Sequence, residues 1–158
     1  FTGDLYGRDD VEAVIDDGRG FLRRTSEQFD VVLLSMVDTS AATAAGAYTL
    51  TENSLYTTDA MSDFLARLSP DGLLEISTVS LPELAVGARL VAVARVALRA
   101  RGAEPARAVA VLRSSWLGNS AAVLNAVMIK PSGLSDAERA DALLGAAKGR
   151  RLLYPQPN

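Results

Sequence analysis

The chemistry open to this chain of 158 residues is limited to carboxylates, hydroxyls, amides, Lys and Arg, because the sequence contains neither His nor Cys. Thiol nucleophiles, thiolate metal sites, disulfides and imidazole acids or bases are therefore excluded. Asp16 and Asp17 follow a β-prone run at residues 11–15, and Asp38 follows a longer apolar run at residues 29–36. A carboxylate held at the end of a strand can accept a hydrogen bond from an amino group, or take a proton from an amine that attacks as a nucleophile.

Composition and charge describe a single domain, residues 1–158, with a hydrophobic core. Hydrophobic residues make up 49% of the sequence, and a chain of this length can bury roughly 70% of the surface that it exposes when unfolded. The 16 Lys and Arg against 19 Asp and Glu give a net charge of −3 without a basic run, so nucleic acid is not an expected partner. No apolar run approaches the ~20 residues of a membrane span and no signal-peptide pattern is present, so we expect no direct membrane insertion of this segment.

Apolar runs and helical spacings alternate along the chain and predict an α/β fold. The expected strands are residues 11–15, 29–36, 73–79, 108–112 and 121–129, and the expected helices are residues 20–26, 54–68, 82–101 and 135–147. This alternation indicates a partial doubly wound, mostly parallel, Rossmann-like sheet, in which the last two strands pair antiparallel. Ligands of such sheets bind beyond the carboxyl ends of the strands, which is where the acidic turns lie.

Local patterns mark three further boundaries. The run Ser69-Pro70-Asp71-Gly72 is typical of a turn and is expected to end the preceding helix. Ser135 and Glu138 have the spacing of a capping box, so a helix is expected to begin there. The tail at residues 151–158 holds two prolines and is expected to be a surface segment.

Four short motifs occur in a characteristic order. They are VIDDGR at residues 14–19, FDVVLL at residues 29–34, LTE at residues 50–52 and LSPDGLL at residues 68–74. In this order they resemble the spermidine synthase family, whose members are aminopropyltransferases with a methyltransferase-like Rossmann fold. The loop at residues 37–39 is most similar to the bacterial branch that is fused to membrane-spanning segments. The resemblance covers about residues 10–80, and the later elements agree with it in type and length.

The resemblance implies a function in polyamine biosynthesis. The reaction would transfer an aminopropyl group from an S-adenosylmethionine-type nucleoside to an amine. S-adenosylmethionine or its decarboxylated form would be the co-substrate, with no covalently bound cofactor and no metal. The resemblance also implies a cytoplasmic location, in a parent protein that upstream spans would tether to the membrane.

Five residues take site roles from this resemblance. Asp17 falls on the position whose carboxylate accepts a hydrogen bond from the adenine amino group, and Asp16 and Gly18 share that cofactor-binding turn. Asp38 falls on the second of two aspartates that bracket the amine, where it would bind the substrate and act as the catalytic base. Ser35, also assigned to the nucleoside site, replaces the first of these aspartates, and a hydroxyl is not a comparable base. From the residues alone, Asp16 or Asp17 could instead cap the next helix, and Asp38 could serve a turn.

Three more residues are expected to bind substrate. Glu52 and Tyr56 match the acidic and aromatic positions at the start of the next helix, where the family orders its active-site loop. Because aromatic residues at helical spacing usually pack in the core, core packing is the alternative for Tyr56. Tyr48 is a candidate for lining the same loop, with helix packing or surface exposure as its alternatives.

The family fold also has elements without a counterpart in this sequence. The Gly-rich turn after the family's first strand and the acidic residue after its second strand are not found before Val11. The chain, which begins Phe1-Thr2-Gly3, is therefore expected to be an excised C-terminal portion that lacks the first two strands and is inactive alone. An exposed sheet edge would favour a homo-oligomer.

Other functions remain open at this point. The replacement of an aspartate by Ser35 is compatible with a non-catalytic nucleoside-binding or regulatory domain. A methyltransferase would use the same fold on a different acceptor. A structural or assembly module would require only that the acidic turns cap helices.

Overall fold

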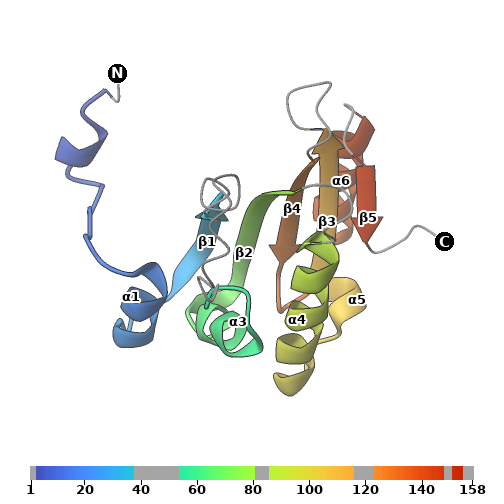
Figure 1. The fold of residues 1–158 in the computed structure, drawn as a ribbon, viewed down its shortest axis with the longest axis horizontal. Helices are drawn as coiled ribbons and strands as arrows, with labels where there is room; N and C mark the ends of the chain where they lie inside the picture. The colour runs from blue at the N-terminus through green and yellow to red at the C-terminus, as the bar shows by residue number, and fades with distance from the viewer. Residues whose placement is uncertain (1–2, 38–53, 81–85, 116–122, 148–150, 155–158) are drawn as a thin grey trace, which may run out of the picture.

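The computed structural model describes residues 3–37, 54–80, 86–115, 123–147 and 151–154. These residues form an α/β fold, in which helices flank one mixed sheet (Figure 1). The strands are β1 (Phe29–Ser35), β2 (Leu68–Ser80), β3 (Val109–Ser115), β4 (Val123–Ile129) and β5 (Arg151–Tyr154). The helices are η1 (Leu5–Gly7), α1 (Gly18–Arg24), α3 (Thr58–Leu65), α4 (Val86–Ala100), α5 (Pro105–Ala108) and α6 (Asp136–Ala147).

The sheet has the strand order β1-β2-β4-β3-β5 among the described residues. β1 pairs parallel with β2, while β4 pairs antiparallel with both β2 and β3, and β5 pairs antiparallel with β3. The predicted antiparallel pairing of the last two strands is confirmed by β3 and β4. The prediction of a mostly parallel sheet is wrong, because β4 follows β3 closely in the chain and inserts between β3 and β2.

Two chain segments differ from their predictions because of pairing. Residues 11–15 form no strand, and Val14 and Ile15 are 49% and 104% exposed. The N-terminal segment runs apart from the sheet (Figure 1), and β-prone residues form a strand only when a neighbouring strand accepts their main-chain hydrogen bonds. The tail was expected to be a surface segment, yet β5 within it pairs with β3.

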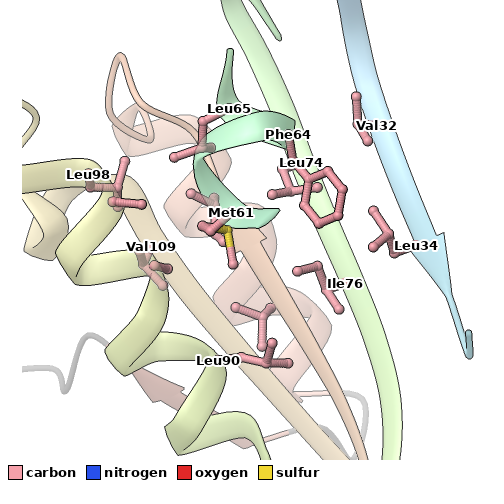
Figure 2. Packing of buried hydrophobic residues seen from close by; sticks show 14 of the residues in the cluster. Val32, Leu34, Met61, Phe64, Leu65, Leu74, Ile76, Leu90, Leu98 and Val109 are labelled. Atoms are coloured by element: carbon pink, nitrogen blue, oxygen red, sulfur yellow. The ribbon is translucent and has the colours of Figure 1, made fainter. Parts of the chain in front are cut away.

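The hydrophobic core lies between one face of the sheet and helices α3 and α4. In Figure 2, Val32 and Leu34 point from β1 towards Phe64 of α3, and Leu74 and Ile76 of β2 lie beside them. Side chains of a strand alternate between its two faces, so the residues between these belong to the other face of the sheet. That face is open at β1, whereas α6 packs against β3 and β5.

Helices α3 and α4 cover the core face of the sheet, the one on which Val32, Leu34, Leu74 and Ile76 lie. The Thr57 hydroxyl caps α3 by accepting a hydrogen bond from the Ala60 N–H at 3.1 Å. The buried residues of each helix recur at helical spacing; they are Ala60, Met61, Phe64 and Leu65 in α3, and Gly87, Leu90, Ala94, Ala97 and Leu98 in α4. Small residues in α4 let its backbone approach the sheet closely, and a Cβ on Gly87 would lie 3.1 Å from the Asn125 side-chain oxygen.

The expected turn at residues 69–72 is part of β2. Phe29 pairs with Leu68 but Val31 pairs with Leu73, so the extra residues of β2 form an irregularity in the ladder. Gly72 fits there because a Cβ would lie 2.8 Å from the Phe29 carbonyl oxygen and 3.0 Å from the Leu68 Cβ. The glycine of the LSPDGLL motif is therefore required by the close approach of two strands.

Candidate functional site

The acidic turn at Asp16 and Asp17 forms the start of α1. The Asp17 carboxylate accepts a hydrogen bond through Oδ1 from the Gly20 N–H at 2.6 Å, which makes it the N-cap of the helix. Asp16 Oδ1 accepts from the Asp17 N–H at 2.8 Å, and Asp16 Oδ2 forms an ion pair with Arg24. The capping alternative is thus confirmed for Asp17, and Gly18 is the first residue of the helix that Asp17 caps.

The capping interaction leaves part of the Asp17 carboxylate open. Asp17 is exposed, and its Oδ2 has no partner among the described residues. One oxygen therefore holds the turn while the other is able to accept a hydrogen bond from a bound molecule. Capping and ligand binding are compatible at this residue.

Helix α1 is anchored to α3 and its neighbouring segments through two arginines. Arg19 Nε pairs with Asp63 Oδ2 at 2.7 Å, and Arg19 also donates to the Ser54 carbonyl oxygen at 2.9 Å. Both side chains of the ion pair are mostly buried. Arg67 Nε donates to the Leu22 carbonyl oxygen at 2.8 Å, at the other end of the helix. These contacts fix the position of the Asp17 carboxylate relative to the sheet.

Ser35 ends β1 beside polar residues of β2. It pairs with Ser77, and the next pair on the same face of the sheet, two residues earlier in each strand, joins Leu33 to Glu75. The Ser77 hydroxyl donates to the Glu75 carboxylate. After Ser35 the chain turns sharply, because Met36 adopts a left-handed backbone conformation with φ 50°.

Glu75 is a candidate residue that the sequence analysis missed. It is half-buried on the open face of the sheet, and burial raises the pKa of its carboxyl group, although the hydrogen bond from Ser77 acts in the opposite direction. A carboxyl group with a raised pKa beside polar neighbours is a common feature of functional sites. The alternation along β2 could have revealed it, since Glu75 and Ser77 are polar residues two apart and therefore share one face of the strand.

The remaining predicted residues fall in two groups. Asp38, Tyr48 and Glu52 lie outside the described residues. Tyr56 is 5% exposed and belongs to the hydrophobic core. This is the core-packing alternative that the sequence left open for it. The described structure therefore places Asp16, Asp17 and Gly18 in one turn and Ser35 at the end of a strand.

A second polar cluster lies at the opposite end of the strands. Lys130 follows β4, and its Nζ contacts Glu138 Oε1 at 2.8 Å and Asp71 Oδ1 at 3.0 Å. The predicted capping box is confirmed: Ser135 N–H donates to Glu138 Oε2 at 2.7 Å, and Glu138 N–H donates to Ser135 Oγ at 3.2 Å. The Lys130 side chain is 9% exposed.

The charged groups of this cluster stabilise one another's ionised forms. Hydrogen bonds from Lys130 and Ser135 lower the pKa of Glu138 to about 2, and those from Lys130 and Ser132 lower the pKa of Asp71. The adjoining open pocket of about 480 Å³ includes these groups and Arg107 in its lining. Because the lysine already has two carboxylate partners, the cluster is best explained as a clamp that holds α6 to β2 and β4.

No protein-family model matches this chain, and no curated protein is significantly similar to it in sequence. Among the described helices, none is long and apolar enough to cross a membrane. Across the same residues, no three His, Cys, Asp or Glu side chains are grouped so that they could hold a metal ion.

Proposed function

We propose that this chain is the C-terminal portion of a spermidine synthase-like transferase domain that binds an S-adenosylmethionine-type nucleoside through Asp17. The observation that carries the proposal is the Asp17 carboxylate itself. One of its oxygens is fixed by the start of α1, and the other is exposed. An exposed acceptor in a fixed position suits the exocyclic amino group of adenine, which donates hydrogen bonds.

The anchoring of α1 supports this role. A binding group loses less conformational freedom on complex formation when the protein already holds it in place. The ion pair between Arg19 and Asp63 and the hydrogen bond from Arg67 hold the helix that Asp17 caps. Other ligands that carry an amino group could also bind this carboxylate. We choose a nucleoside because of the resemblance carried by the order of VIDDGR, FDVVLL and LSPDGLL along the chain.

The transferase step follows from the chemistry of a sulfonium compound. The nitrogen of a neutral amine attacks the aminopropyl carbon next to the sulfonium, the new N–C bond forms as the C–S bond breaks, and methylthioadenosine leaves with the electron pair. The amine loses its extra proton to a base, which the resemblance assigns to Asp38. Positioning of the two substrates supplies most of the acceleration in such a displacement.

Calorimetric titration with S-adenosylmethionine, its decarboxylated form and methylthioadenosine tests the nucleoside site. Asp17→Ser keeps a good helix cap but removes the second carboxylate oxygen, so we expect a loss of about tenfold or more in affinity with unchanged folding. Asp10→Ser, which removes an exposed carboxylate whose ion-pair partner among the described residues is Arg8, is the matched control and should bind normally. If Asp17→Ser and the unchanged protein bind the nucleosides with equal affinity, Asp17 serves as the helix cap and does not bind the nucleoside.

Ser35 favours a second candidate, a nucleoside-binding domain without transferase activity. It occupies the position of a carboxylate in the resemblance, and its register partner on β2 is Ser77, which is also uncharged. Binding of the nucleoside to the complete parent protein without formation of methylthioadenosine, even with amines present, would identify this function. Release of S-adenosylhomocysteine would instead identify a methyltransferase.

A further inference from the structure

A row of polar residues crosses the sheet on the face that α4 covers. Thr78 of β2 pairs with Asn125 of β4, and Asn125 pairs with Arg113 of β3. Directly paired residues share a face of the sheet. Asn125 lies under the start of α4, because a Cβ on Gly87 would be only 3.1 Å from its side-chain oxygen. The residues two positions earlier or later in these strands are apolar members of the core: Ile76, Val111 and Val127. The row therefore forms a polar end of the core face.

Two side chains of this row have polar atoms that are buried without a partner. Neither the Thr78 hydroxyl nor the Arg113 Nε has a hydrogen-bond partner among the described residues. Arg113 also forms no ion pair with any carboxylate that the structure describes. Leaving a buried donor unpaired costs free energy, and the cost is larger for a charged group. Since folded proteins rarely contain such groups, two of them in one row indicate that a bound molecule supplies the missing partner.

The surroundings of Arg113 favour a negatively charged partner. Its register partner on β5 is Arg151, so the row extended to β5 contains two arginines and no acidic residue. The first turn of α4 contains no acidic residue either, and the N-terminus of a helix carries a partial positive charge. Because like charges at directly paired positions destabilise a sheet, an anion bound beside them would be stabilising.

We propose that Arg113 and the first turn of α4 bind the anionic group, a carboxylate or a phosphate, of a small molecule. The planar guanidinium can donate two parallel hydrogen bonds to either group, which an ammonium group cannot do. Arg113 is only partly buried, so a ligand can reach it from solvent. The Cα atoms of Thr78 and Arg113 are two strand spacings, about 10 Å, apart. The Thr78 hydroxyl can therefore contact a second polar group of the same molecule.

Thermal unfolding of the 158-residue chain with inorganic phosphate or with acetate tests this site. The ionic strength is held constant with sodium chloride, so that general screening of charges is the same in every sample. We expect the Tm to rise with the concentration of the anion, because a molecule that binds only the folded state stabilises it. A larger rise with phosphate identifies a phosphate site, and an equal or larger rise with acetate identifies a carboxylate site.

Three variants assign the binding to Arg113. Arg113→Gln removes the charge, and we expect its affinity for the anion to fall by about tenfold or more. Arg113→Lys keeps the charge without the planar fork, so its affinity should be intermediate. In the absence of phosphate and acetate, Arg113→Gln should be at least as stable as the unchanged chain, since it removes a charge that has no partner. Arg95→Gln is the matched control, because Arg95 is an exposed arginine of α4, and it should bind like the unchanged chain.

The NMR signal of the Arg113 Nε–H gives a direct measurement in the unchanged chain. It is assigned through the carbons of the same side chain, so this measurement does not require a variant to fold. We expect the signal to shift as phosphate is added and its exchange with water to become slower, because the bound anion accepts hydrogen bonds from the guanidinium. The corresponding signal of Arg95 should not change.

Three results would overturn the proposal. The first is a Tm and an Arg113 signal that neither anion changes beyond the sodium chloride control. The second is full stabilisation of Arg113→Gln by the anion, which would mean that the anion binds elsewhere. The third is a lower Tm for Arg113→Gln without phosphate or acetate, which would mean that a group of the chain itself already pairs with the arginine. Neither probe contains adenine, so this site and the proposed nucleoside site are tested separately.

Discussion

Gly72→Ala is expected to destabilise the fold through steric overlap with three neighbouring atoms. A Cβ at this position would lie 2.8 Å from the Phe29 carbonyl oxygen and 3.0 Å from both the Leu68 Cβ and the Ser69 nitrogen. Two of these three atoms belong to the backbone, so relieving the strain requires β1 to move away from Gly72 and the backbone of β2 to shift at its own irregularity. Overpacking of this kind costs about 1–3 kcal/mol.

Thermal and urea unfolding measure this cost. For a chain of this size the expected loss corresponds to a decrease in Tm of about 2–12 °C, and the urea midpoint should fall with little change in the slope m. Gly18→Ala is the control, because nothing lies within 4 Å of a Cβ built on Gly18, and its stability should be unchanged or slightly higher. An unchanged Tm for Gly72→Ala would refute the steric explanation of the LSPDGLL motif.

Two further predictions concern helix ends. Stability should fall as the pH decreases from about 4.5 towards 2, because the Glu138 pKa is about 2 in the folded protein and 4.5 when unfolded, so the unfolded state takes up the proton first. Urea unfolding across this window should show a weaker pH dependence for Glu138→Gln; an identical pH profile would contradict the clamp. Thr57→Ala should cost about 1 kcal/mol by removing the cap of α3, whereas Thr57→Ser should cost less, as measured by urea unfolding. Equal stability of the two variants would show that the cap contributes nothing.

Much of the fold could be predicted because its signals are local. The capping box of Ser135 and Glu138 needs only residues three apart, and the structure contains it. The apolar spacing of α3 depends on the helical repeat alone. The antiparallel pairing of β3 and β4 could be predicted since the two strands are close in the chain.

Less of the candidate site could be predicted from the sequence. The two roles of Asp17 cannot be distinguished from its position before Gly18, because a helix cap and a ligand contact require the same residue type. The neighbourhood of Ser35 depends on the register between β1 and β2, which sets Ser77 and Glu75 beside it. Register is a property of paired strands, so the sequence of β2 could show that Glu75 and Ser77 share a face but not which residues of β1 lie beside them.

The sequence by itself determined the local conformations: where helices are capped, which residues alternate in a strand, and which acidic residues follow an apolar run. Only the tertiary structure decided which strands have partners. Residues 11–15 are as β-prone as a real strand but remain outside the sheet, while the turn-like residues 69–72 are drawn into β2. The physical reason is that a strand is stabilised by hydrogen bonds to a neighbour distant in sequence, whereas a helix satisfies most of its hydrogen bonds within itself.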